Sequence, residues 1–300
     1  KAGSKVALYG AGAGRTIKGG TGSGDVNERE SVTIWQGMKN AGFEITSEDW
    51  IRSYEKIYEK ARQDWKDDIV TRSGGNGGNV MDFFTVYSTT PFIMPTGDPV
   101  EKPEKDCDTA IYVLSRVAGE GADRNAAKGD YYLKEDEHQM LSDLFSYYKN
   151  VIVAVNAGGQ VDLSFMDEFS NIKALLILSQ PGMEGGIAFA DVISGKVNPS
   201  GKLVDSWAYR YEDYPNAASF SHNNGNVEKE FYEEGIYVGY RYFDTFAGPV
   251  RYGFGYGLSY TNFEIKEKNI QCDSEHNFQV SVSVKNTGDT AGKEVVQIYA

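Results

Sequence analysis

Short apolar runs alternate with helical patterns through most of this chain, and this alternation restricts the fold more than any other feature. Strands that are apolar throughout are typical of a sheet buried on both faces. Strands separated by helices are expected to run parallel, with helices over both faces. The sequence therefore predicts a layered α/β sandwich with a mostly parallel sheet. The expected strands are 5–9, 43–45, 110–114, 151–155 and 174–178, and the expected helices are 27–41, 50–69, 135–149, 162–169 and 185–194.

Two segments depart from this alternation. Residues 72–106 are rich in Gly, Pro, Asn and Thr and predict a long irregular excursion, which in compact domains is usually functional or mobile. After Gly257, apolar residues alternate with polar ones from Phe278 to Val284, a turn pattern follows at 286–289, and a further strand is expected at 295–299. The chain is thus predicted to change from α/β to all-β structure near residue 257.

The most informative local segment runs from Ser115 to Arg124, directly after the expected strand 110–114. It contains the triplet Gly119-Glu120-Gly121, and glycines permit backbone conformations that are closed to other residues. A carboxylate between two such glycines is expected to point outward from the end of the strand. Open α/β sheets bind ligands at the carboxyl ends of their strands, so Glu120 is well placed for proton transfer.

This segment resembles glycoside hydrolase family 3, most closely its bacterial β-glucosidases, and the likeness extends along nearly the whole chain. The glycine loop 18–25 is similar to an early loop of that family's second domain. Ser115–Arg124, together with Lys128–Leu133, is similar to the stretch that carries its general acid/base. Five ordered motifs over most of the chain make the signal specific, and the remaining three are 195–203, 232–242 and 254–260.

The resemblance implies hydrolysis of terminal β-D-glucosidic bonds by a retaining double displacement, with Glu120 as the general acid/base. Retaining glycosidases pair such an acid with a carboxylate nucleophile about 5–5.5 Å away. An acid that is protonated near neutral pH needs a raised pKa, from partial burial or a neighbouring carboxylate. In this family the nucleophile is an aspartate on a separate TIM-barrel domain. No trace of that barrel is found in this sequence, so this section alone is expected to be inactive.

Three further residues are assigned roles beside Glu120. By resemblance, Ser23 corresponds to a serine that hydrogen-bonds the sugar in the −1 subsite, although Ser is also common in loops for structural reasons. Asp123 and Arg124 are expected to form a local ion pair that fixes the loop, and such a pair can tune the pKa of Glu120.

The resemblance also implies the domain organisation. Residues 1–257 are expected to form the α/β sandwich domain that carries the acid/base. Residues 258–300 resemble the start of a fibronectin type III-like domain, which needs about seven strands and is incomplete here. The expected partners are a β-glucoside or oligosaccharide substrate and the TIM-barrel domain of the same protein. No cofactor is implied, and an oligomer is compatible with the sequence.

Composition excludes several other classes of protein. The net charge of -13 argues against a nucleic-acid or anionic membrane surface as a partner. The two cysteines, Cys107 and Cys272, are far apart and imply no disulfide framework. The three histidines are scattered, so no metal site is expected. No apolar run approaches the ~20 residues of a membrane span. The first residue is not Met, so the N-terminus resembles a cut linker, and the absence of a signal peptide carries little information. The sequence leaves the compartment unknown, with bacterial cytoplasm as the favoured expectation.

Alternative interpretations remain open on the sequence alone. The chain is compatible with a non-catalytic carbohydrate-binding or accessory module. The glycine run 10–14 after a strand suggests a nucleotide-binding α/β protein, but it lacks the ordered G-x-G-x-x-G with a helix directly behind it. Rival carboxylates for catalysis are Glu184, Glu233 and Glu234. Glu184 is expected to favour a helix start, and the consecutive pair is expected to point to opposite faces of an extended chain.

Overall fold

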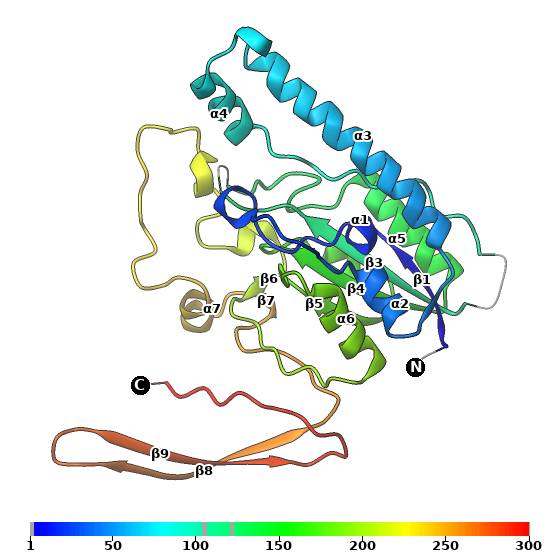
Figure 1. Cartoon of the computed structure of the whole chain (residues 1–300). Coiled ribbons are helices and arrows are strands. Elements are labelled where there is room, and N and C mark those ends of the chain that lie inside the picture. Colours follow the sequence, from blue (N-terminus) through cyan, green and yellow to red (C-terminus); the bar gives the residue numbers. More distant parts are fainter. Residues whose placement is uncertain (1–2, 104–106, 121–122, 300) are drawn as a thin grey trace. The chain divides into compact units, whose positions relative to one another are not determined.

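The structure is a computed structural model that describes residues 3–103, 107–120 and 123–299. Residue contacts divide it into two compact units (Figure 1). The first unit comprises residues 1–194 and 209–230, and the second comprises residues 195–208 and 231–300. The candidate site predicted from the sequence lies in the first unit.

A five-stranded parallel sheet forms the centre of the first unit, in the order β2-β1-β3-β4-β5. The pairing is continuous from Thr109 to Arg116 of β3, which matches Asn150 to Ala157 of β4 residue by residue. These two strands are almost entirely buried, as their unbroken apolar sequences predict. The strands are β1 (Lys5–Tyr9), β2 (Glu44–Ile45), β3 (Thr109–Arg116), β4 (Asn150–Ala157) and β5 (Ile172–Ile177).

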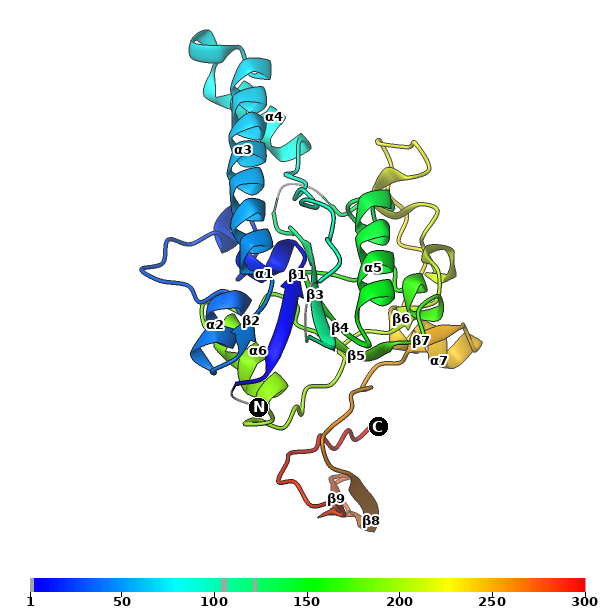
Figure 2. The ribbon, with the colours of Figure 1, turned by 90° about the vertical axis from the view of Figure 1, so that its right-hand side faces the viewer.

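Helices cover both faces of this sheet, which confirms the predicted α/β sandwich (Figure 2). On one face, Leu8 of β1 and Ile111 of β3 share a buried cluster with Phe189 of α6 and with residues of α2. On the other face, the Tyr9 ring contacts Tyr148 at the end of α5. Alternate strand residues point to opposite faces, so each strand contributes to both layers. The helices of the first unit are α1 (Ala11–Gly14), α2 (Ile34–Asn40), α3 (Glu48–Arg72), α4 (Val80–Thr89), α5 (Glu135–Tyr147) and α6 (Gly185–Ser194).

Three helical segments differ from the sequence prediction. The helix expected at 162–169 is a short 3₁₀ helix, Ser164–Asp167. Helix α2 begins at Ile34 rather than near residue 27, because Thr33 caps it in a capping box with Gln36. The prediction that residues 72–106 are irregular throughout was wrong, since α4 lies within them. The side chain of Asn79 caps α4 by accepting a hydrogen bond from the backbone N–H of Asp82 at 2.9 Å. Figures 1 and 2 show α4 beside the distal end of α3, away from the sheet.

The second unit contains two antiparallel strand pairs. Strands β6 (Trp207–Ala208) and β7 (Val250–Tyr252) form one pair, and β8 (Phe263–Cys272) and β9 (Phe278–Asn286) form the other. Helix α7 (Tyr240–Phe246) is the only α-helix among the described residues of this unit. The expected alternating strand is found as β9, but 295–299 is not assigned as a strand. Among the described residues of the whole chain, no helix has the length and apolarity needed to span a bilayer.

Candidate functional site

Loops from several strands meet at the carboxyl end of the sheet, and Asn156 at the end of β4 joins them. Its side-chain oxygen accepts the backbone N–H of Ile17 at 2.7 Å, and its amide nitrogen donates to the carbonyls of Ile17 and Ser179. Asn156 is fully buried, so these bonds satisfy an otherwise costly polar group. The loop after β1 is thereby fixed to those after β4 and β5.

The loop after β1 then pairs with the segment that carries Glu120. Thr21 and Gly119 form a parallel bridge: the Thr21 N–H donates to the Ala118 carbonyl at 3.1 Å, and the Glu120 N–H donates to the Thr21 carbonyl at 3.3 Å. The pairing fixes the backbone of residues 118–120 against Thr21. Glu120 is exposed there, beyond the end of β3, as the sequence predicts.

Ser23 binds both oxygens of the Glu120 carboxylate, although 97 residues separate them in sequence. The Ser23 backbone N–H donates to Oε2 and the Ser23 hydroxyl donates to Oε1, each at 2.8 Å. Gly22 makes this approach possible. Its φ of +73° favours glycine, and a Cβ there would lie 2.6 Å from both Cβ and Oε2 of Glu120. The two strongest candidates from the sequence are therefore direct hydrogen-bond partners.

These bonds affect the charge state of Glu120. The backbone N–H of Ser23, followed by its hydroxyl, holds the pKa of Glu120 below its ordinary value. A general acid needs the opposite shift, so the raised pKa expected from the sequence is not found in this environment. The carboxylate as it stands is ionised at neutral pH, which suits a general base.

Arg116, the last residue of β3, anchors the chain that follows Glu120. Its guanidinium donates to both carboxylate oxygens of Glu137 at 2.7 Å, and also to the carbonyls of Ser115, Asp130 and Tyr132. Arg116 and Glu137 are each only 4% exposed. A bidentate, buried pair of this kind fixes geometry because both groups lose most of their rotational freedom. It ties residues 130–132 to β3 and α5.

The ion pair predicted between Asp123 and Arg124 was wrong, because Arg124 pairs with Asp130 instead. The Arg124 Nε donates to the Asp130 carboxylate at 2.6 Å, and its two terminal nitrogens donate to the carbonyls of Gln160 and Asp130. Asp123 is exposed. Arg124 therefore secures the loop after Glu120 to a neighbouring loop, and Asp130 has a structural role that the sequence did not indicate.

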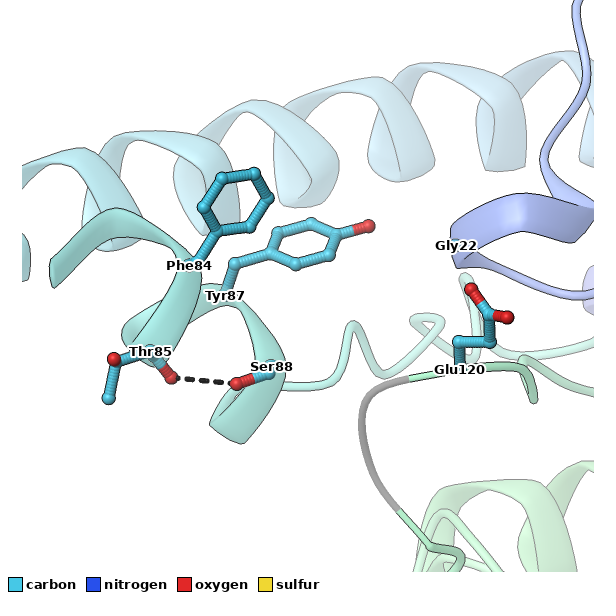
Figure 3. A pocket seen from close by; sticks show the side chains of 6 residues that line it. All are labelled: Gly22, Phe84, Thr85, Tyr87, Ser88 and Glu120. Atoms are coloured by element: carbon cyan, nitrogen blue, oxygen red, sulfur yellow. Dashed lines mark hydrogen bonds between the residues drawn. The ribbon is translucent and has the colours of Figure 1, made fainter. Parts of the chain in front are cut away.

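An open hollow of about 340 Å³ lies beside Glu120, between the Gly22 loop and helix α4 (Figure 3). A smaller space of about 70 Å³ is also lined by Tyr87, Ser88 and Glu120, and it extends toward Arg124 and Asp130. Helix α4 is the part of the site that the sequence missed. Because Gly and Pro are frequent in the segment around it, no helix was predicted there, although the apolar and aromatic residues of α4 could have indicated one. The larger hollow is lined by Gly22, Phe84, Thr85, Tyr87, Ser88 and Glu120.

The other candidate sites from the sequence do not join this one. Glu184 is exposed at the start of α6 and lines neither of the spaces beside Glu120. Glu233 and Glu234 belong to the second unit. In the part of the chain that the structure describes, no group of three or more His, Cys, Asp or Glu side chains is arranged to hold a metal ion.

The glycine run 10–14 does not form a phosphate-binding loop. Its residues Ala11–Gly14 make a single helical turn that is completely buried. A Cβ at Gly12 would collide with the Ser115 hydroxyl and lie 2.5 Å from a Val113 methyl group. The glycine therefore permits close packing against β3, and no space is left for a nucleotide phosphate at this turn.

The chain is similar to known glycosidases over almost its full length. The profile of the glycosyl hydrolase family 3 C-terminal domain matches residues 1–240. A β-glucosidase of Ruminococcus albus is 38% identical over 288 residues, which cover 94% of this chain and 28% of that protein. β-Glucosidase A of Butyrivibrio fibrisolvens is 33% identical over 338 residues, which cover 99% of this chain and 38% of that protein.

A solved structure gives the same result for the fold. β-Glucosidase 3B of Thermotoga neapolitana in complex with glucose superposes with a TM-score of 0.75 at 33% identity, covering 97% of this chain and 39% of that one. The chain thus spans well under half the length of each of these relatives.

Proposed function

Because this chain belongs to glycoside hydrolase family 3, we propose that it supplies the general acid/base, Glu120, to a retaining β-glucosidase. The observation that carries the proposal is the arrangement of Glu120 itself. The residue is exposed beyond the end of a buried strand, and both of its carboxylate oxygens are held by Ser23. A carboxylate with a purely structural role does not need to be held by two fixed donors while it faces a hollow of about 340 Å³.

The second carboxylate of the mechanism is assigned to a TIM-barrel domain of the same protein. The acidic residues that adjoin Glu120 are poorly suited to this role. Asp130 is already bound by Arg124, and Asp123 belongs to the same loop as Glu120. In the first step Glu120 protonates the departing oxygen while the nucleophile attacks the anomeric carbon. In the second step the Glu120 carboxylate removes a proton from water, which hydrolyses the glycosyl-enzyme with net retention.

Ser23 is proposed to contribute to the −1 sugar subsite, as its relation to the family suggests. Its hydroxyl is adjacent to the proton-transferring group, at 2.8 Å from Glu120 Oε1, so a sugar bound for protonation comes close to it. Arg124 and Asp130 hold the following loop in place. Residues 258–300, which include the β8–β9 hairpin, are proposed to begin a fibronectin type III-like domain.

The test is Glu120→Ala in the complete enzyme, with Glu184→Ala as a matched control at an exposed glutamate. Cellobiose hydrolysis should fall by about 10²–10⁴-fold, since its leaving group needs a proton. A dinitrophenyl glucoside should still form the glycosyl-enzyme, which then accumulates because no base activates water. Azide needs no base and should restore turnover, giving β-glucosyl azide with retained configuration. Glu184→Ala should behave as the wild type.

Equal rate losses on both substrates, without azide rescue, would refute the assignment of Glu120. An inactive wild-type enzyme on every aryl β-glucoside would favour the non-catalytic accessory module. The 300-residue chain by itself should show no hydrolysis above background, because only one of the two carboxylates is present.

A further inference from the structure

We propose that Phe84 and Tyr87 of helix α4 form the wall that binds the aglycone, the part of the substrate that leaves. This inference rests on the proposed role of Glu120. The expected ligand chemistry is a ring with a flat apolar face, either a second pyranose or an aryl group.

The position of the wall follows from the chemistry of the leaving group. A general acid must lie within hydrogen-bond reach of the oxygen that it protonates. That oxygen belongs to the aglycone, so the aglycone must occupy space next to the Glu120 carboxylate. Both spaces that Glu120 lines are also lined by Tyr87 and Ser88. Figure 3 shows the Tyr87 ring across the larger hollow, with its hydroxyl directed to the side of Gly22 and Glu120.

The Tyr87 ring is held in place before any ligand arrives. It stacks on Phe83 with ring centroids 6.1 Å apart and packs against Trp65 at 5.8 Å. Trp65 is fixed in turn, because its indole N–H donates to the Thr90 carbonyl at 2.8 Å and its ring packs against Phe92. A rigid aromatic surface binds a ring at a lower entropic cost than a mobile one.

Phe84 makes the hollow apolar. Its side chain is 59% exposed, although a phenyl ring is usually buried. The hydroxyls beside it are already used within the helix, since Thr85 donates to the Met81 carbonyl and Ser88 donates to the Thr85 carbonyl. On the α4 side the hollow therefore presents mainly apolar ring faces, with the Tyr87 hydroxyl at one edge, and an exposed apolar surface beside reactive groups is typical of a ligand site.

The test compares Phe84→Ala and Tyr87→Ala in the complete enzyme, with Met81→Ala as the control. Met81 lies on the same helix and is 72% exposed, but it does not line either space. The substrates are cellobiose, p-nitrophenyl β-glucoside and β-glucosyl fluoride. The fluoride leaves as a single atom, which is too small to reach α4, so it reports on the glucose subsite and the nucleophile alone.

Each variant should lower kcat/KM for cellobiose, for the aryl glucoside or for both by about 2–12-fold, the range for one aromatic contact. The rate with glucosyl fluoride and the values for Met81→Ala should not change. A loss confined to one substrate identifies whether the sugar or the aryl ring uses the wall.

Two outcomes would overturn the inference. Unchanged kcat/KM for both large substrates would mean that the aglycone does not touch α4. Equal losses on all three substrates, with a lowered melting temperature, would mean that these side chains support the fold and do not bind the aglycone. Neither outcome affects the proposed function, which is tested separately by Glu120→Ala and by the activity of the wild-type enzyme on aryl β-glucosides.

Discussion

The buried pair Arg116–Glu137 gives the sharpest stability prediction, through Glu137→Gln. The substitution keeps the shape of the side chain and one acceptor oxygen, but it removes the negative charge. The Arg116 guanidinium then remains in the interior without a counter-charge, since its other acceptors are the neutral carbonyls of residues 115, 130 and 132. Removing one partner of a buried ion pair costs about 3–5 kcal/mol.

This free energy translates into a measurable change in melting temperature. For a domain of about 150–250 residues, 1 kcal/mol corresponds to about 2–4 °C, so Glu137→Gln should lower it by about 6–20 °C. The matched control is Asp64→Asn, which breaks the exposed pair with Lys60 on α3. Exposed pairs contribute about 0–1 kcal/mol, and the control should shift the melting temperature by about 4 °C at most.

The assay is thermal unfolding followed by circular dichroism, at pH 7 and at two salt concentrations. The Asp64→Asn shift should shrink at high salt, whereas the Glu137→Gln shift should persist, because ions do not screen a buried pair effectively. Equal shifts for the two variants would refute the reasoning. They would mean that water or a rearranged loop compensates Arg116, and that the pair does not anchor the chain after Glu120.

The remaining predictions concern the contacts of Glu120. Ser23→Ala removes one of the two hydrogen-bond donors to Glu120, so the pKa of Glu120 should rise. A general acid loses activity as it deprotonates, so the alkaline limb of the kcat/KM–pH profile should move to higher pH. The same variant should lower kcat/KM several-fold because the contact with the sugar is lost, while the melting temperature should stay the same. If the kinetics do not change, Ser23 has only a structural role in the loop. Gly22→Ala should reduce kcat more than Ser23→Ala, because its methyl carbon would lie 2.6 Å from Cβ and Oε2 of Glu120 and displace the carboxylate. Gly24→Ala, with nothing within 4 Å of its Cβ, should be neutral.

The sheet could be predicted from the sequence because buried parallel strands are apolar throughout. Each of the three strands after residue 108 was found within a few residues of its predicted range, and α6 was found at 185–194 as predicted. Helix α4 was not predicted because the turn-forming residues around it indicate a loop, whereas its own apolar residues indicate a helix. Glycine, asparagine and proline surround it, and its cap at Asn79 is also a common turn residue. Its aromatic face is partly exposed, so the usual pattern of a buried stripe is absent.

The candidate residues of the site could also be named from the sequence, but not their contacts. Glu120 and Ser23 were selected for separate reasons, and only the folded chain brings them to 2.8 Å. The partner of Arg124 is Asp130, six residues along rather than the adjacent Asp123. The role of Asn156 in joining the loops could not be predicted, because a single asparagine at the end of an apolar strand belongs to no recognisable sequence motif. Contacts of this kind depend on loop geometry, which hydrophobic periodicity does not encode.

In the proposed double displacement, the two steps require opposite charge states of Glu120, and this chain by itself favours only one. The hydrogen bonds from Ser23 lower the pKa of Glu120 and therefore stabilise the base needed in the second step. We propose that the acid needed in the first step is favoured by the substrate itself. An aglycone against Phe84 and Tyr87 would exclude water from the carboxylate, and desolvation raises the pKa of an acid.

This coupling predicts a difference between two pH profiles for cellobiose, whose poor leaving group makes the first step slow. The alkaline pKa in kcat/KM reports the free enzyme, and that in kcat reports the enzyme–substrate complex. We expect the alkaline pKa in kcat to be the higher of the two, and the difference to shrink in Tyr87→Ala. Identical alkaline limbs in the wild-type enzyme would show that the aglycone does not desolvate Glu120. The raised pKa would then have to come from the barrel domain before substrate binds.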